Sequence, residues 1–80
     1  MIIKILGSGC ANCANLEAAA REATVALGLG ATFEKVTDVV AIAGYGVMRT
    51  PGLVVDEQLV LSGRVPTATQ VREILAALVG

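Results

Sequence analysis

The sequence predicts an α/β domain in which one mixed four-stranded sheet carries helices on both faces. Three observations lead to this prediction. Short apolar, β-branched runs alternate with helical stretches in the order βαβαββα. The initial strand–helix–strand unit implies a parallel pair with a right-handed crossover. Two later strands are separated by only two residues, which indicates an antiparallel hairpin. Because the chain has 80 residues, we expect residues 1–80 to form a single domain.

The first half of the chain is predicted to form a strand, a long helix and a second strand. Residues 2–6 are an apolar run that ends at a Gly-Ser-Gly segment, which indicates a buried strand. Residues 11–27 contain neither Pro nor Gly and are rich in Ala, Leu and Glu, which favours a helix. Gly28 and Gly30 end this helix, and residues 31–37 indicate the second strand.

The long helix is predicted to present one apolar stripe to the core. The stripe recurs at three- and four-residue steps and comprises Cys13, Leu16, Ala20, Ala23 and Leu27. Glu17 and Arg21 are four residues apart, so they can interact along the helix, and we expect both on its solvent side.

The second half is predicted to form a short helix, a hairpin and a final helix. Asp38 can cap a helix over residues 39–43, which Gly44 ends. Residues 52–55 and 58–62 form the two strands of the hairpin.

The final helix begins with a capping box. Thr67 and Gln70 have the spacing at which each side chain bonds the backbone N–H of the other residue. The helix that follows has an apolar face with the spacing i, i+3, i+4, i+7, made by Val71, Ile74, Leu75 and Leu78.

The composition excludes several classes of function. A net charge of −1 with scattered signs and 2% aromatic residues argue against nucleic-acid binding. The absence of His excludes His-dependent catalytic triads and His metal ligands. The N-terminal apolar run is too short for a signal peptide and is interrupted by Lys4. No segment approaches the roughly 18 apolar residues of a membrane span. We therefore expect a cytoplasmic protein without a membrane partner, where a close cysteine pair is more often catalytic or metal-binding than structural.

Cys10 and Cys13 carry the chemistry that remains. They lie where a Gly-rich turn opens a helix, so unsatisfied N–H groups, including those of Asn12 and Cys13, and the positive end of the helix dipole point toward Cys10. Such a placement lowers the pKa of a cysteine, in known cases to roughly 3.5–7.5, and the thiolate is the reactive form. The spacing brings the two thiols close enough to form a disulfide. Because Cys13 belongs to the apolar stripe, we expect it to be the more buried thiol and to resolve a bond made by Cys10.

Three segments of the chain resemble the thioredoxin/glutaredoxin superfamily. They are Gly-Cys-Ala-Asn-Cys at residues 9–13, Tyr-Gly-Val at residues 45–47, and Thr-Pro at residues 50–51, where the hairpin opens. Over essentially its whole length the chain most resembles the thioredoxin-like proteins called small redox-active disulfide protein 2. The resemblance implies a minimal thioredoxin fold, with the first and third helices on one face of the sheet and the second helix on the other.

The resemblance also implies roles for individual residues. Cys10 would be the attacking thiolate and Cys13 the resolving thiol, with no cofactor beyond the disulfide they form. Pro51, which the residues alone indicate as a strand-start proline, would be the family's cis-proline. The backbone of Thr50 would hold an extended stretch of the partner. The implied activity is that of a protein-disulfide reductase or electron carrier, whose partners are target proteins with disulfides and a reductase that donates electrons.

The sequence departs from the family patterns at several positions. The dipeptide Ala-Asn between the cysteines differs from the Gly-Pro of typical thioredoxins and the Pro-aromatic of typical glutaredoxins, and this dipeptide tunes the redox potential. The first strand carries Lys4 and lacks the buried carboxylate typical of thioredoxins. Gly63 and Arg64 stand where glutaredoxins commonly have Gly-Gly and an acid, which puts glutathione binding in doubt.

Arg49 and Asn12 are candidate modulators of the thiolate. Arg49 directly precedes the Thr-Pro dipeptide, so in this fold it can lie near Cys10. A cation there would lower the thiolate pKa further or attract an anionic partner. A solvated loop arginine is the simpler interpretation and is favoured. Tyr45 and Met48 are interpreted as loop-packing residues.

Two other interpretations stay open. Gly-Ser-Gly-Cys-x-x-Cys at residues 7–13 is also similar to heavy-metal-associated domains, so the pair could bind a soft metal such as Cu(I), alone or shared between two chains. Those domains have the order βαββαβ and a Met where this chain has Ser8, and two thiolates fall short of the four ligands of a zinc site. We therefore prefer the redox interpretation and predict no metal. In the third interpretation, the domain keeps the fold but binds partners through a redox-inert surface.

Overall fold

The computed structural model describes residues 1–7, 11–47 and 49–79 of the chain. Within these residues the order of elements is βαβαββα, as the sequence predicts. The elements are β1 (Ile2–Leu6), α1 (Ala11–Leu27), β2 (Thr32–Val36), α2 (Val39–Gly44), β3 (Gly52–Val55), β4 (Gln58–Ser62) and α3 (Ala68–Val79).

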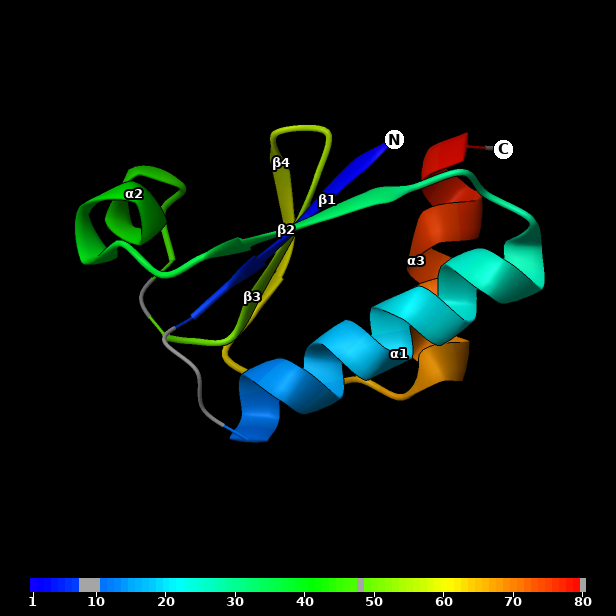
Figure 1. Cartoon of the computed structure of the whole chain (residues 1–80), viewed down its shortest axis with the longest axis horizontal. Helices are drawn as coiled ribbons and strands as arrows, with labels where there is room; N and C mark the ends of the chain where they lie inside the picture. Colours follow the sequence, from blue (N-terminus) through cyan, green and yellow to red (C-terminus); the bar gives the residue numbers. More distant parts are fainter. Residues whose placement is uncertain (8–10, 48, 80) are drawn as a thin grey trace.

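The four strands form one mixed sheet in the order β2-β1-β3-β4. β1 and β2 are parallel, with α1 as their crossover, whereas β1 with β3 and β3 with β4 are antiparallel. α1 and α3 lie on one side of the sheet, and α2 lies on the other (Figure 1). Since Leu6 pairs with Gly52, the last residue of β1 and the first residue of β3 meet at one end of the sheet. The predicted α/β fold, with helices on both faces of a mixed sheet, is confirmed.

Side-chain alternation along the strands divides the core into two layers. Ile3 and Ile5 of β1 belong to the larger layer, which α1 and α3 cover. Leu6 belongs to the smaller layer with Ile42 of α2 and Val47. The amphipathic pattern of α1 is confirmed, since most of its predicted stripe is fully buried and Leu27 packs at its edge.

A bulge in the hairpin lets β4 contribute to both layers. Leu59 and Leu61 are two residues apart and would share one face of a regular strand. The register shifts between Leu53, which pairs with Leu61, and Val54, which pairs with Leu59. Val60 is the extra residue on the bulged strand. As a result Leu61 lies in the larger layer, and Leu59 packs against the smaller one.

The hairpin turn is fastened to the neighbouring strand. Asp56 and Glu57 have φ angles of 48° and 69°, the positive values of a two-residue type I′ turn. The backbone N–H of Asp56 donates to the carbonyl of Ile2, and the Asp56 carboxylate accepts from the N–H of Ile2, both at 2.8 Å. These two bonds tie the turn to the start of β1.

The predicted helix caps are present. The N–H of Val40 donates to the Asp38 carboxylate at 3.1 Å, which caps α2. At α3 the N–H of Gln70 donates to the Thr67 hydroxyl at 3.2 Å, and the N–H of Thr67 donates to the Gln70 amide oxygen at 3.0 Å. The reciprocal pair is the capping box expected from the sequence.

Three expectations differ from the structure in detail. The second strand is shorter than residues 31–37, and α2 includes Gly44 rather than ending before it. A left-handed glycine, Gly46 with φ of 83°, follows at the end of that helix. Leu78, placed on the apolar face of α3, is 41% exposed. No helix in the described ranges is both long and apolar enough to cross a membrane.

Candidate active site

Cys13 lies in the first turn of α1 and is only 6% exposed. Its predicted burial is therefore confirmed. Cys10 lies outside the described residues, so the expectation that Cys10 is the more exposed of the two thiols stays a prediction. In the sequence it immediately precedes Ala11, where α1 begins.

Gly7 provides the surface against which the Cys13 thiol packs. Gly7 continues β1, and its N–H donates to the carbonyl of Val36 at 2.9 Å. A Cβ atom placed on Gly7 would overlap the Cys13 sulfur, so only the absence of a side chain leaves room for the thiol. The Cβ atom of Thr50 lies 3.7 Å from the same point. Gly7 is thus the place where Cys13 and Thr50 come together, although 37 residues separate them in the sequence.

The loop that precedes β3 lies beside this contact. The Thr50–Pro51 peptide bond is cis, which agrees with the isomer that the resemblance implies. Pro51 is buried, whereas Thr50 is exposed. The carbonyl of Pro51 accepts a hydrogen bond from the N–H of Gly63 at 2.9 Å, which fastens this loop to the loop after β4. Gly52 follows, and a Cβ atom there would lie only 3.3 Å from the Leu6 side chain.

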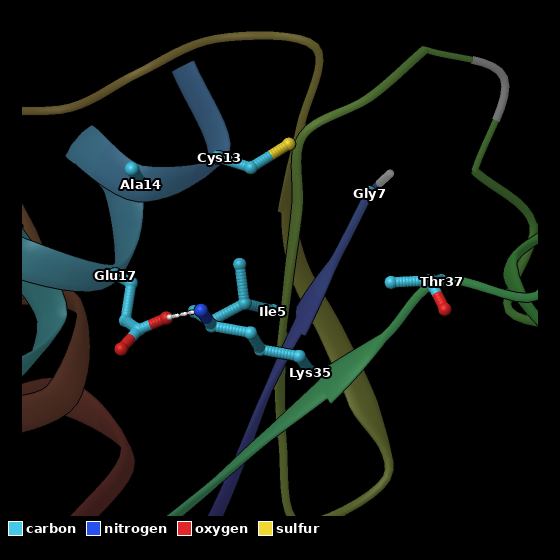
Figure 2. Close-up of a pocket in the computed structure, with 7 residues that line it drawn as sticks. All are labelled: Ile5, Gly7, Cys13, Ala14, Glu17, Lys35 and Thr37. Carbon is cyan, nitrogen blue, oxygen red and sulfur yellow. Dashed lines mark ion pairs between the residues drawn. The ribbon is translucent and has the colours of Figure 1, made fainter. Parts of the chain in front are cut away.

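A cavity of about 210 Å³ opens between α1 and β2, next to Cys13 (Figure 2). It is lined by Ile5, Gly7, Cys13, Ala14, Glu17, Lys35 and Thr37. Figure 2 shows the Cys13 sulfur directed toward Gly7 and the Glu17 carboxylate directed toward Lys35. The Cys13 thiol therefore shares this cavity with the carboxylate of Glu17 and the ammonium group of Lys35.

Glu17 joins α1 to β2 through two ion pairs. Its carboxylate lies 2.9 Å from Nε of Arg21 and 3.3 Å from Nζ of Lys35. The hydrogen bond from Arg21, together with Lys35, holds the pKa of Glu17 below its usual range. The expected helical pair of Glu17 and Arg21 is present; Arg21 is exposed, and the Glu17 side chain is 18% exposed, at the edge of the cavity. The Arg21 guanidinium lies 4.5 Å from the centre of the Phe33 ring, which holds it over β2.

The sequence patterns do not predict the Glu17 carboxylate as a feature of the site. The carboxylate typical of thioredoxins lies on the first strand, where this chain has Lys4. The spacing of four residues between Cys13 and Glu17 places them on the same face of α1, one turn apart, and that spacing was the available signal.

Lys4 belongs to a polar network on the α2 side of the sheet. Its ammonium forms an ion pair with Glu57 and donates to the Tyr45 hydroxyl at 2.9 Å, and that hydroxyl donates to Glu57 at 3.0 Å. The hydrogen bond from Lys4 lowers the pKa of Glu57, and the hydrogen bond to Glu57 raises the pKa of Lys4. Tyr45 thus makes intramolecular contacts, in keeping with its interpretation as a packing residue. Met48 lies outside the described residues.

The two candidate modulators are both exposed. Asn12 occupies the second position of α1. Arg49 lies on the Thr-Pro loop, and its Cβ atom would be 3.3 Å from a Cβ atom placed on Gly63. The predicted proximity of either residue to the Cys10 thiol stays a prediction, because Cys10 is not described.

Across the described residues, no three Cys, Asp or Glu side chains gather as a metal site.

Fold and site together define a class of protein. A mixed sheet in the order β2-β1-β3-β4, a Cys-x-x-Cys sequence ending in the first turn of α1, and a cis-proline before β3 are the features of a thioredoxin fold. A family model described as a thioredoxin domain matches residues 1–76. A protein named thioredoxin from Methanothermobacter thermautotrophicus is 45% identical over 76 residues, which cover 95% of this chain and 99% of the relative. A thioredoxin from Methanocaldococcus jannaschii is 36% identical over 73 residues, which cover 91% of this chain and 84% of that relative.

The chain belongs to the thioredoxin family. Family membership confirms the resemblance found in the sequence and, at the level of the family, makes the chain a protein of the thiol–disulfide oxidoreductase type.

Proposed function

We propose that the chain reduces disulfide bonds in target proteins, with Cys10 as the attacking thiolate and Cys13 as the resolving thiol. The observation that carries the proposal is the meeting of Cys13 and Thr50 at Gly7. It supports placing the reaction centre where α1, which carries Cys13, adjoins the loop that contains Thr50 and Pro51. A partner segment held along the exposed Thr50 backbone would bring its disulfide to the same end of the sheet.

The reaction proceeds by two exchange steps. The Cys10 thiolate attacks one sulfur of the target disulfide, a Cys10–target disulfide forms, and the other target sulfur leaves as a thiolate that takes up a proton. Cys13 then loses its proton and attacks the Cys10 sulfur. The Cys10–Cys13 disulfide forms and the second target thiol is released. The target gains two electrons and two protons, and a reductase returns the same number to the cysteine pair.

The burial of Cys13 supports this division of roles. A thiol that is 6% exposed and packed against Gly7 is poorly accessible to a bulky protein disulfide. It can still attack a sulfur that is held next to it, because the second step is intramolecular. The position of Cys10 in the sequence, immediately before α1, supports its role as the nucleophile, since a helix N-terminus stabilises a thiolate.

Trapping of the mixed disulfide tests the proposal. The reduced chain is mixed with a peptide pair joined by one disulfide, and the products are identified by intact mass. Cys13→Ser should accumulate a covalent complex with one peptide, and Cys10→Ser should form none. Cys13→Ala is the matched control and should trap the same complex, because neither Ser nor Ala can resolve it. Reduction of the peptide disulfide by Cys10→Ser at the wild-type rate would show that the roles are assigned wrongly.

A further inference from the structure

Two exposed arginines lie on the two loops that meet beside Pro51. The stem of Arg49 packs on Gly63, with its Cβ and Cδ atoms 3.3 and 3.7 Å from the position of a Cβ atom on that glycine. Gly63 in turn donates its N–H to the carbonyl of Pro51, and Arg64 is the next residue. The hydrogen bond and the stem contact join the loop that carries Arg49 to the loop that carries Arg64. Any side chain at position 63 would push against the Arg49 stem.

Neither of these two cations has a carboxylate partner within the described part of the chain. Lys4, Arg21 and Lys35 each pair with a glutamate. Arg72 also makes no ion pair among the described residues, but it lies on α3, where it lines a shallow depression together with Glu22. Arg49 and Arg64 are therefore the unneutralised positive charges at the loops around the proposed reaction centre.

Most acidic residues lie away from these loops, and Glu17, which lines the cavity beside Cys13, is already paired with Arg21 and Lys35. Asp56 and Glu57 form the turn at the opposite end of β3 from Gly52. Asp38 stands at the same end as the Thr-Pro loop, but its carboxylate accepts from the helix N–H of Val40. The first turn of α1 carries no acid. The loops around Thr50 thus combine two free guanidinium groups with the positive end of a helix dipole.

We propose that Arg49 and Arg64 select target disulfides whose flanking residues are acidic, an inference that rests on the proposed function. A partner segment lying along the exposed residue Thr50 would run beside the two joined loops that carry these arginines. Carboxylates on that segment can accept paired hydrogen bonds from a guanidinium, whose planar fork matches their geometry. A lysine at the same place on the segment would be repelled. The chain itself is nearly neutral, so this preference comes from local placement of charge and not from net charge.

Three peptides test this charge preference. They share one intramolecular disulfide and differ only in the residue that flanks it, which is Asp, Asn or Lys. We expect the reduced full-length chain to reduce them in the order Asp, Asn, Lys, with steps of about two- to five-fold in kcat/KM, the range of one exposed ion pair. The steps should shrink as ionic strength rises, because salt screens exposed charges.

Charge-neutral variants test whether the preference for acidic flanking residues comes from Arg49 and Arg64. The double variant Arg49→Gln/Arg64→Gln should reduce all three peptides at similar rates. Arg72→Gln, which removes an equivalent charge from α3, should keep the wild-type order. Equal and measurable rates for the three peptides with the wild-type chain, or an unchanged order in the double variant, would overturn the charge preference alone. A wild-type chain that reduces none of the peptides would overturn the proposed function, and this inference with it.

Discussion

At the scale of single residues, the site depends on a glycine, whose lack of a side chain leaves room for the Cys13 thiol. Gly7 is buried at the end of β1, and the sulfur of Cys13 occupies the space that a Cβ atom would fill. Thr50 closes the same space from the other side. Two features favour glycine here, the close approach of the thiol and a positive φ of 155°.

Gly7→Ala should therefore destabilise the protein and disturb the cysteine. The new methyl group has to displace Cys13, and overpacking of a buried position typically costs about 1–3 kcal/mol. The free energy of unfolding in urea measures the loss, and the rate at which an alkylating reagent modifies the thiols reports the displacement of Cys13. Gly46→Ala is the matched control, because Gly46 also has a positive φ, of 83°, but a Cβ atom on it has no neighbour within 4 Å, so it should cost less stability and leave the alkylation rate unchanged. An equal loss of stability in the two variants would contradict the packing argument.

At the scale of elements, Glu17 fastens α1 to β2. It accepts from Arg21 within α1 and from Lys35 across to β2, and its side chain is partly exposed between them. Because the same cavity contains Cys13, the carboxylate holds the helix that carries the thiol against the edge strand of the sheet. The ion pairs thus serve the geometry of the site as well as the stability of the domain.

Glu17→Gln should lower the free energy of unfolding by about 0.2–1 kcal/mol at pH 7, the range of solvent-accessible ion pairs. The folded protein depresses the pKa of Glu17 below 4.5, its value in the unfolded chain. The stabilisation is therefore complete above that pH and is lost as the pH falls through the folded pKa. Urea unfolding at a series of pH values should show the wild type and the variant converging in acid. Glu22→Gln, an exposed position on α1, is the control and should show no such convergence. A difference that stays constant with pH would argue against the ion pairs.

The elements themselves were largely predictable because local chemistry specifies them. The capping box at Thr67 and Gln70 and the cap at Asp38 depend on residues a few positions apart, and both appear as expected. The bulge around Val60 was not predictable, because it results from pairing with β3 rather than from the residues of β4. The exposure of Leu78 likewise depends on how α3 packs against the rest of the domain, which no pattern within α3 records.

The site was predictable only in part, for a similar reason. Cys13 could be placed from its position in the apolar stripe. The contacts of Gly7 with Cys13 and Thr50, and of Arg49 with Gly63, join segments far apart in the sequence. Such contacts depend on the order of the strands in the sheet, which sequence patterns do not determine. The family resemblance indicated only that the Cys-x-x-Cys segment and the Thr-Pro dipeptide lie close together.

At the scale of the whole molecule, the stability of the domain depends chiefly on the layer between the sheet and the α1–α3 pair. The second layer, under α2, contains only a few buried side chains. α1 presents the small residues Ala19, Ala20 and Ala23 toward the core, which lets α3 approach closely. A domain of 80 residues has no other large core within the described residues to compensate for a defect in this layer.

Leu75→Ala should consequently remove a large part of the stability of the protein. Leu75 is fully buried in this layer, and deletion of such a side chain costs about 2–5 kcal/mol, against a total of about 5–15 kcal/mol for a typical domain. Leu78→Ala is the matched control, because it makes the same change one turn along α3 at a side chain that is 41% exposed. Since Leu and Ala have similar helix propensities, any difference between the two variants reports burial rather than helix formation. Urea unfolding should show a loss of at most about 1 kcal/mol for Leu78→Ala. Comparable losses in the two variants would contradict the conclusion that burial of Leu75 in this layer stabilises the domain.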